Sequence, residues 1–100
     1  MSSTTEPDEQ FWEMADSFIK LANEQSQNID PNKVDTAMRY ASARFSANIV
    51  ASHASDAEAI KADKEKATKH FSDQYQQMFS DNLEDYEINF DAYAAKANPS

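Results

Sequence analysis

The chain has 100 residues, which is enough for one domain with a single modest hydrophobic core. It contains no Gly and no Cys, and its formal net charge is −9. The lack of Gly removes the residue that β-hairpin turns with positive φ most often need, so the composition favours an all-α fold. The lack of Cys excludes a disulfide framework, a thiolate metal site and a cysteine nucleophile.

The negative charge is unevenly distributed along the sequence. Residues 1–30 carry −6 and residues 81–100 carry −4, whereas residues 31–55 carry +2 and residues 56–80 carry −1. An acidic surface repels phosphate groups, so we expect neither a nucleic-acid partner nor binding to acidic membranes. No apolar run is long enough to span a membrane, and the first residues lack the basic and apolar parts of a signal peptide, so we expect a cytoplasmic protein.

A first helix is predicted over residues 7–27, after a disordered tail at 1–6. Its apolar residues recur three and four positions apart and cover nearly half of the helix circumference. They are Phe11, Trp12, Met14, Ala15, Phe18, Ile19, Leu21 and Ala22. A face this broad favours packing against more than one neighbouring helix.

The stretch NIDPNKV predicts the start of a second helix, over residues 31–53. Asp30 suits the N-cap and Pro31 the first helical position, while Ile29 and Val34 have the spacing of a hydrophobic staple. Asn28 can end the first helix in the left-handed conformation. Because the connection is short, we expect the first two helices to be antiparallel neighbours.

The second helix is rich in small residues, in the stretch AMRYASARFSANIVAS at 37–52. These residues form two apolar faces, which would let the helix lie close to two others. We therefore interpret the stretch as core and not as a site. Arg39 is expected to point into solvent.

A third helix is predicted over residues 56–79, antiparallel to the second. Ser55 and Glu58 have the spacing of a capping box. A helical stripe of apolar positions then passes through Phe71, Tyr75 and Phe79. Four lysines alternate with acids in KADKEKATK (61–69), which predicts a solvated face with weak ion pairs.

The segment 80–95 either continues the third helix or breaks at 80–82 and folds back as a short fourth helix. A continuous helix would extend well beyond the start of the second helix, and the aromatic residues in that extension need a partner. Residues 96–100 are predicted to form a tail, with Asn98 and Pro99 ending the last helix. The predicted fold is thus an all-α antiparallel bundle of three helices, with a long or broken third helix and a possible short fourth helix, in a single domain of residues 1–100.

Arg44 lies at the border of the two apolar faces of the second helix. Antiparallel packing would bring it near Glu13 or Asp16, which predicts an ion pair that fixes the register of the two helices. The alternative is an arginine that anchors a ligand, in a pocket with Tyr40 and Asn48. Asn48 is interpreted as a buried amide that sets helix register, or else as the floor of that pocket.

No catalytic, cofactor or metal site is predicted. The sequence has no Glu-x-x-His pair, so a carboxylate metal centre of a helical bundle is not expected. His53 is interpreted as a cation near a helix C-terminus, and His70 as a solvated side chain. Phosphate-binding loops need Gly, which the chain lacks. We therefore do not expect an enzyme, although a small-molecule-binding or catalytic bundle with a pocket near Arg44 is kept as the alternative.

The acidic aromatic end of the chain carries the strongest functional signal. Aromatic residues supply contact area in protein interfaces, and the charges around them supply selectivity. We predict a protein–protein interaction or adaptor module that binds a protein partner or forms a homodimer. The candidate surface consists of Leu83, Glu84, Asp85, Tyr86, Phe90 and Tyr93. The other interpretation of this end is a fourth core helix. For the whole chain, a structural accessory subunit of a complex is a further alternative function.

Three stretches together resemble a known family: FWEMADSFIKLANEQ (11–25), AMRYASARFSANIVAS (37–52) and FSDQYQQMFSDNLEDYEINF (71–90). The family consists of short bacterial proteins of unknown function, mostly from Gram-negative species, and the resemblance covers about residues 10–92. It implies a cytoplasmic, stand-alone, helical protein. It carries over no activity and no catalytic or binding residue.

Overall fold

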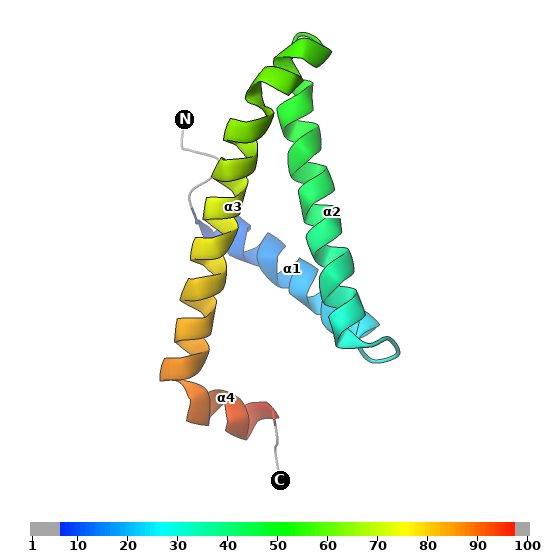
Figure 1. Ribbon diagram of the computed structural model, residues 1–100. Helices are drawn as coiled ribbons and strands as arrows, with labels where there is room; N and C mark the ends of the chain where they lie inside the picture. The colour runs from blue at the N-terminus through cyan, green and yellow to red at the C-terminus, as the bar shows by residue number, and fades with distance from the viewer. Residues whose placement is uncertain (1–6, 98–100) are drawn as a thin grey trace. The chain divides into compact units, whose positions relative to one another are not determined.

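The computed structural model describes residues 7–97, together with the side chains of residues 7–95. These residues form four helices and no strand: α1 (Glu9–Gln25), α2 (Pro31–Ser52), α3 (Ala57–Ile88) and α4 (Phe90–Ala97) (Figure 1). The predicted all-α class, with a long third helix and a short fourth, is confirmed. The chain divides into two groups, Met1–Ile49 and Val50–Ser100, which are described separately. The predicted tail at 1–6 and the helix end at Asn98 and Pro99 lie outside the described residues.

The first helix is shorter than the sequence predicts at its C-terminal end. Asp8 is its N-cap, and the Asp8 carboxylate accepts a hydrogen bond from the backbone N–H of Phe11 at 2.8 Å. The helix ends at Gln25, and the N–H of Ser26 still donates to the carbonyl of Ala22. The prediction that Asn28 ends this helix in the left-handed conformation is wrong, because no described residue has a positive φ. The chain leaves the helix through right-handed turns, which need no Gly.

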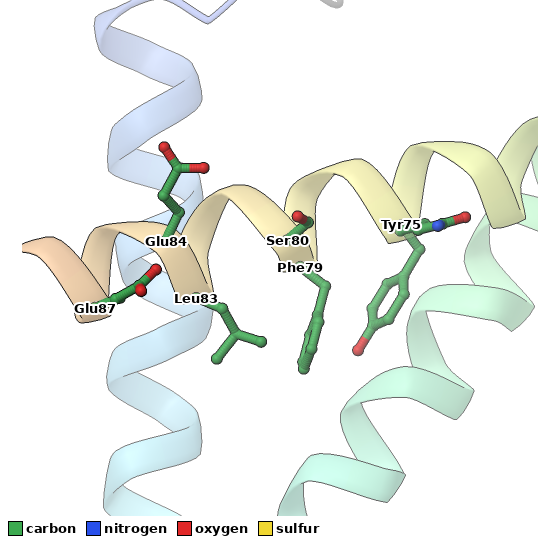
Figure 2. Close-up of a pocket in the computed structure, with 7 residues that line it drawn as sticks. Tyr75, Phe79, Ser80, Leu83, Glu84 and Glu87 are labelled. Atoms are coloured by element: carbon green, nitrogen blue, oxygen red, sulfur yellow. The ribbon is translucent and has the colours of Figure 1, made fainter.

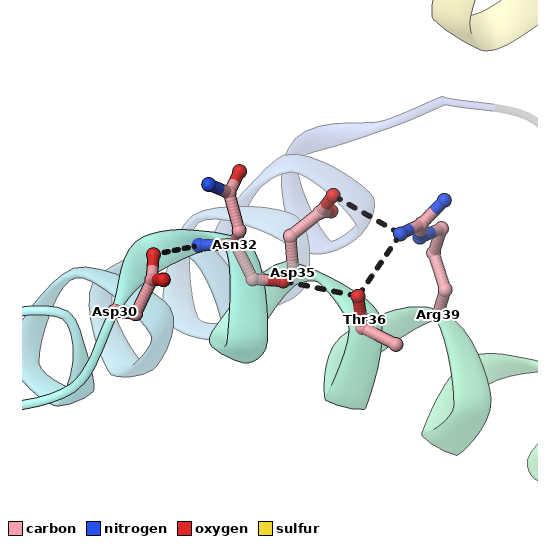
Figure 3. A network of polar contacts seen from close by, with 5 residues as sticks. All are labelled: Asp30, Asn32, Asp35, Thr36 and Arg39. Carbon is pink, nitrogen blue, oxygen red and sulfur yellow. Dashed lines mark hydrogen bonds and ion pairs between the residues drawn. The ribbon is translucent and has the colours of Figure 1, made fainter.

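The predicted start of α2 is confirmed. The Asp30 carboxylate accepts a hydrogen bond from the backbone N–H of Asn32 at 2.9 Å, and Pro31 is the first helical residue (Figure 3). Arg39 is exposed, as the sequence predicts, and its side chain also makes contacts within α2. Its guanidinium lies 3.5 Å from the Asp35 carboxylate and donates to the Thr36 hydroxyl at 3.2 Å (Figure 3). This exposed pair is four residues apart in one helix, so it supports the helix only weakly.

The third helix begins one residue later than the capping box predicts. Asp56 is the N-cap, and its carboxylate accepts a hydrogen bond from the N–H of Ala59 at 2.9 Å. The helix then continues without a break through residues 80–82 and ends at Ile88. Its 32 residues correspond to a length of about 48 Å. The change of direction comes at Asn89, after which α4 begins (Figure 1).

Neither group buries a bundle core by itself. Among the side chains at 7–95, Val34 is the one buried residue, with 6% of its surface exposed. Phe11 and a few small residues are half-buried. The broad apolar face of α1 stays exposed, including Trp12 and Phe18. Since soluble monomers seldom leave large contiguous apolar faces in water, these faces are where the chain is expected to make further contacts.

Candidate functional site

A stripe of exposed apolar side chains runs along most of α3. From Phe71 to Tyr86 the side chains recur three or four residues apart, and Ile60 lies eleven residues, about three helical turns, before Phe71, which places all of them on one side of the helix. Their exposed fractions lie between 36% and 55%. We call this set the α3 stripe; it comprises Ile60, Phe71, Tyr75, Met78, Phe79, Leu83 and Tyr86.

The middle of the α3 stripe forms a shallow, open concavity. The rings of Tyr75 and Phe79 are stacked, with centroids 6.0 Å apart and planes at 23°. Figure 2 shows Tyr75, Phe79 and Leu83 projecting to the same side of the helix. Glu84 points to the opposite side from Leu83 (Figure 2). The concavity is lined by Tyr75, Gln76, Phe79, Ser80, Leu83, Glu84 and Glu87.

Acidic residues surround this part of the stripe. Residues 71–95 contain six Asp or Glu and neither Lys nor Arg, which gives this segment a charge of −6. The Asp81 carboxylate accepts a hydrogen bond from the Gln77 amide at 2.8 Å, one helical turn earlier. No described cation pairs with Asp81, Glu84 or Glu87. This part of the α3 stripe therefore lies in a locally negative electrostatic potential, which attracts cations.

The last turn of α3 is tied to α4 through Asp85. One Asp85 oxygen accepts a hydrogen bond from the Tyr93 hydroxyl at 2.5 Å, and the other accepts from the Asn89 amide at 2.8 Å. The rings of Tyr86 and Tyr93 are 4.4 Å apart. The hydrogen bond to Asp85, followed by desolvation and by the charge of Asp85, raises the pKa of the Tyr93 hydroxyl. These contacts bring Tyr93 beside the end of the stripe.

The first half of α3 has the opposite charge. Residues 57–70 carry four Lys and three acids, a charge of +1. Lys69 pairs with Asp73, with an N–O distance of 2.6 Å, as expected for weak ion pairs on a solvated face. Lys61, Lys64 and Lys66 form no ion pair among the described residues. The helix is thus divided into a basic half and an acidic, aromatic half.

Comparison with known families decides where the chain belongs. The model of the family described as "protein of unknown function (DUF3144)" matches residues 11–87. The chain belongs to the DUF3144 family. Comparison with curated proteins and with solved structures finds no match. The DUF3144 match begins in α1 and ends one residue before the end of α3, so α4 lies outside it.

The residues predicted as a candidate surface fall on two helices of this DUF3144 protein. Leu83, Glu84, Asp85 and Tyr86 lie on α3, within the family match, whereas Phe90 and Tyr93 lie on α4. Asp85, Tyr86 and Tyr93 are brought together by the contacts described above. The predicted surface does not include Tyr75 and Phe79, because a possible helix break is placed at 80–82, and it does not include Glu87. The helical stripe through Phe71, Tyr75 and Phe79 continues at the same spacing to Leu83, which is the sequence signal that joins them.

The predicted ion pair between Arg44 of α2 and Glu13 or Asp16 of α1 stays a prediction. Glu13, Asp16 and Arg44 are exposed, and the two ion pairs of the described residues, Arg39–Asp35 and Lys69–Asp73, each lie within one helix. Tyr40, Arg44 and Asn48, the residues of the alternative pocket, are likewise exposed on α2. The interpretation of Asn48 as an amide that sets helix register also stays a prediction.

The histidines do not form part of a metal centre in the described region. His70 lies edge-on to the neighbouring Phe71 ring, 5.1 Å between centroids, and His53 contacts the Ser52 hydroxyl at 3.4 Å. Residues 7–97 contain no cluster of three or more His, Asp or Glu side chains suited to holding a metal ion. None of the described helices is long and apolar enough to cross a membrane.

Proposed function

We propose that this chain is a protein-interaction module. Its binding site is the acidic aromatic surface, which we define as Tyr75, Phe79, Leu83, Asp85, Tyr86, Glu87, Phe90 and Tyr93. Glu84 is left out because its side chain points to the opposite side from Leu83 (Figure 2). The observation that carries the proposal is the exposure of the α3 stripe within its own group of helices, at a place where the segment charge is −6. The partner is a polypeptide that covers the apolar side chains of this surface and places positively charged residues beside its carboxylates.

The energetics of this surface suit a protein partner. Burying apolar surface contributes roughly 25 cal/mol per Å² before the costs of association are subtracted. Aromatic side chains supply much area for little lost side-chain freedom, and Tyr is enriched where binding energy is concentrated. Tyr75, Phe79, Tyr86 and Tyr93 thus provide the area. The surrounding carboxylates select against acidic partners and speed the approach of basic ones.

A small-molecule pocket is the weaker alternative. Ligand sites are usually concave and enclose most of the ligand surface. The concavity between Tyr75 and Glu87 is open and follows the side of one helix. Tyr40, Arg44 and Asn48 are exposed on α2. An extended helix or strand of another polypeptide fits an open ridge better than a compact metabolite does.

Affinity capture with matched baits tests the proposal. The baits are the tagged wild-type chain, the double variant Phe79→Asp/Leu83→Asp, and the control Lys66→Asp, whose position lies on the face of α3 opposite the stripe by helical spacing. We expect a protein that is retained by the wild type and the control and lost with the double variant, after circular dichroism shows similar helicity. Either a second copy or a different protein supports the module. Retention that is equal on all three baits would contradict it.

A further inference from the structure

We infer that the partner on the acidic aromatic surface is a second copy of the chain, with the two α3 helices antiparallel. The basic half of each α3 would then lie against the acidic half of the other. This inference rests on the proposed function and names the occupant of the same surface. It depends on three properties of α3: the length of its stripe, the separation of its charges, and the place of its lysines.

The α3 stripe is longer than the acidic aromatic surface. It extends from Ile60 to Tyr86, which corresponds to about 39 Å along the helix axis. In the first half the stripe is represented by Ile60, which lies eleven residues, about three helical turns, before Phe71 and thus on the line of the second half. A short peptide would leave much of this length in water. A second long helix would cover it from end to end, and α3 of another copy has the required length.

The charges of α3 favour one orientation of two identical helices. Within α3, residues 57–70 carry +1 and residues 71–88 carry −5. In a parallel pair the two acidic segments would lie side by side, and repulsion at distances below the Debye length of about 8–10 Å would oppose association. In an antiparallel pair each acidic segment faces lysines. A two-fold axis perpendicular to the helices then produces the same contact twice.

The lysines of the basic half lie where such a pair needs them. Lys64 precedes Tyr75 by eleven residues, about three helical turns, so it lies in line with the stripe. Lys61 and Lys64 line a shallow concavity on this half of α3 and pair with no described carboxylate. With the pair centred near residue 73, the middle of the stripe, these two lysines lie opposite about residues 82–85. The carboxylates of Asp81 and Glu87 flank that stretch.

The available area matches a modest stable interface. Four aromatic side chains of the stripe (Phe71, Tyr75, Phe79 and Tyr86) are 36–53% exposed. An aromatic side chain buries about 150–250 Å² in full, and about half of each is exposed here, so with Ile60, Met78 and Leu83 added the stripe offers roughly 600 Å² per partner, the low end of the standard interface size.

A charge-swap experiment tests the antiparallel dimer. The first variant is Lys61→Glu/Lys64→Glu and the second is Asp81→Lys/Glu87→Lys. Asp85 is left intact because it holds α4 through Tyr93. Each variant alone places like charges at both ends of the pair. In a 1:1 mixture, a heterodimer places opposite charges at both ends. The mass of each sample is measured by light scattering behind size exclusion, at several protein concentrations.

We expect the wild type to be dimeric at tens of micromolar, each variant alone to dimerise at least ten-fold more weakly, and the mixture to regain the wild-type affinity. The control Lys66→Glu should dimerise like the wild type. A monomeric wild type would overturn the inference, and so would a dimer that both charge reversals leave unchanged or a mixture that does not recover. A monomeric wild type whose surface still captures another protein would leave the interaction module standing and remove only the second copy.

Discussion

The Tyr93 hydroxyl donates a hydrogen bond to the Asp85 carboxylate at 2.5 Å, and this contact joins α4 to the last turn of α3. The two residues are eight positions apart, on either side of the bend at Asn89. Asn89 donates to the other Asp85 oxygen, so one carboxylate holds both the bend and the helix that follows it. The position of the Tyr93 ring beside Tyr86 depends on this carboxylate.

Replacing Tyr93 by Phe should loosen α4 without unfolding α3. The ring contact with Tyr86 can persist, but the hydrogen bond to Asp85 is lost. We expect faster hydrogen exchange of the backbone amides in residues 90–97, with little change in residues 60–80. Tyr86→Phe is the matched control, because the Tyr86 hydroxyl makes no described hydrogen bond. Equal exchange in the wild type and in Tyr93→Phe would contradict a role for this contact.

The same contact predicts a dependence on high pH. The pKa of Tyr93 is raised above its ordinary value of about 10, chiefly by its hydrogen bond to Asp85. A group with a raised folded-state pKa contributes its stabilisation fully below the unfolded pKa, and this contribution is lost as the pH rises through the folded pKa. The attachment of α4 should therefore persist at neutral pH and weaken only above about pH 10. In Asp85→Asn, ultraviolet titration should show Tyr93 ionising at lower pH; an unchanged titration would count against the assignment.

The start of α3 offers a direct comparison between two neighbouring residues. Asp56→Ala removes the carboxylate that accepts from the Ala59 N–H and should lower the free energy of unfolding by about 1 kcal/mol. Ser55→Ala should change it by less than about 0.5 kcal/mol, since Ser55 lies outside the N-cap position. Urea denaturation followed by circular dichroism measures both. A larger loss of stability in Ser55→Ala than in Asp56→Ala would instead support Ser55 as the N-cap.

Val34 is the buried side chain at the start of α2 and should be sensitive to truncation. Val34→Ala removes two methyl groups from a packed position and should cost about 1–2 kcal/mol in the free energy of unfolding. Val50→Ala, at a half-buried position of the same helix, should cost less. Thermal and urea denaturation of the two variants provide the measurement. Equal costs would mean that Val34 is no better packed than Val50.

Local signals in the sequence predicted the helices well. The Asp30–Pro31 cap depends on contacts between neighbouring residues, and α2 begins where this cap predicts. The boundary errors have the same local origin. Asp56 competes with Ser55 for the N-cap, and the extended backbone of Asp56 lets its carboxylate reach the Ala59 N–H. Residue spacing alone does not show which of Ser55 and Asp56 is the N-cap.

The candidate site was predicted only in part, because its limits depend on where α3 ends. Ser80, Asp81 and Asn82 are residue types that favour caps and turns, but the helix continues through them. There Asn82 donates to the carbonyl of Met78, and Asp81 accepts from Gln77, so their side chains are satisfied within the helix. This continuity joins Tyr75 and Phe79 to Leu83 and Tyr86. It extends the predicted surface by two helical turns toward the N-terminus.

The most direct test of the central claim, that the acidic aromatic surface is covered by another polypeptide, is photo-cross-linking in living cells. A photoreactive benzoyl-phenylalanine replaces Phe79, which projects from the stripe beside Leu83 (Figure 2). The same group at Lys66 is the control for the opposite face of α3. We expect an ultraviolet-dependent adduct of defined mass at position 79 and none at position 66, with the attached peptide identified by mass spectrometry. No adduct at position 79, with comparable expression of both proteins, would contradict it.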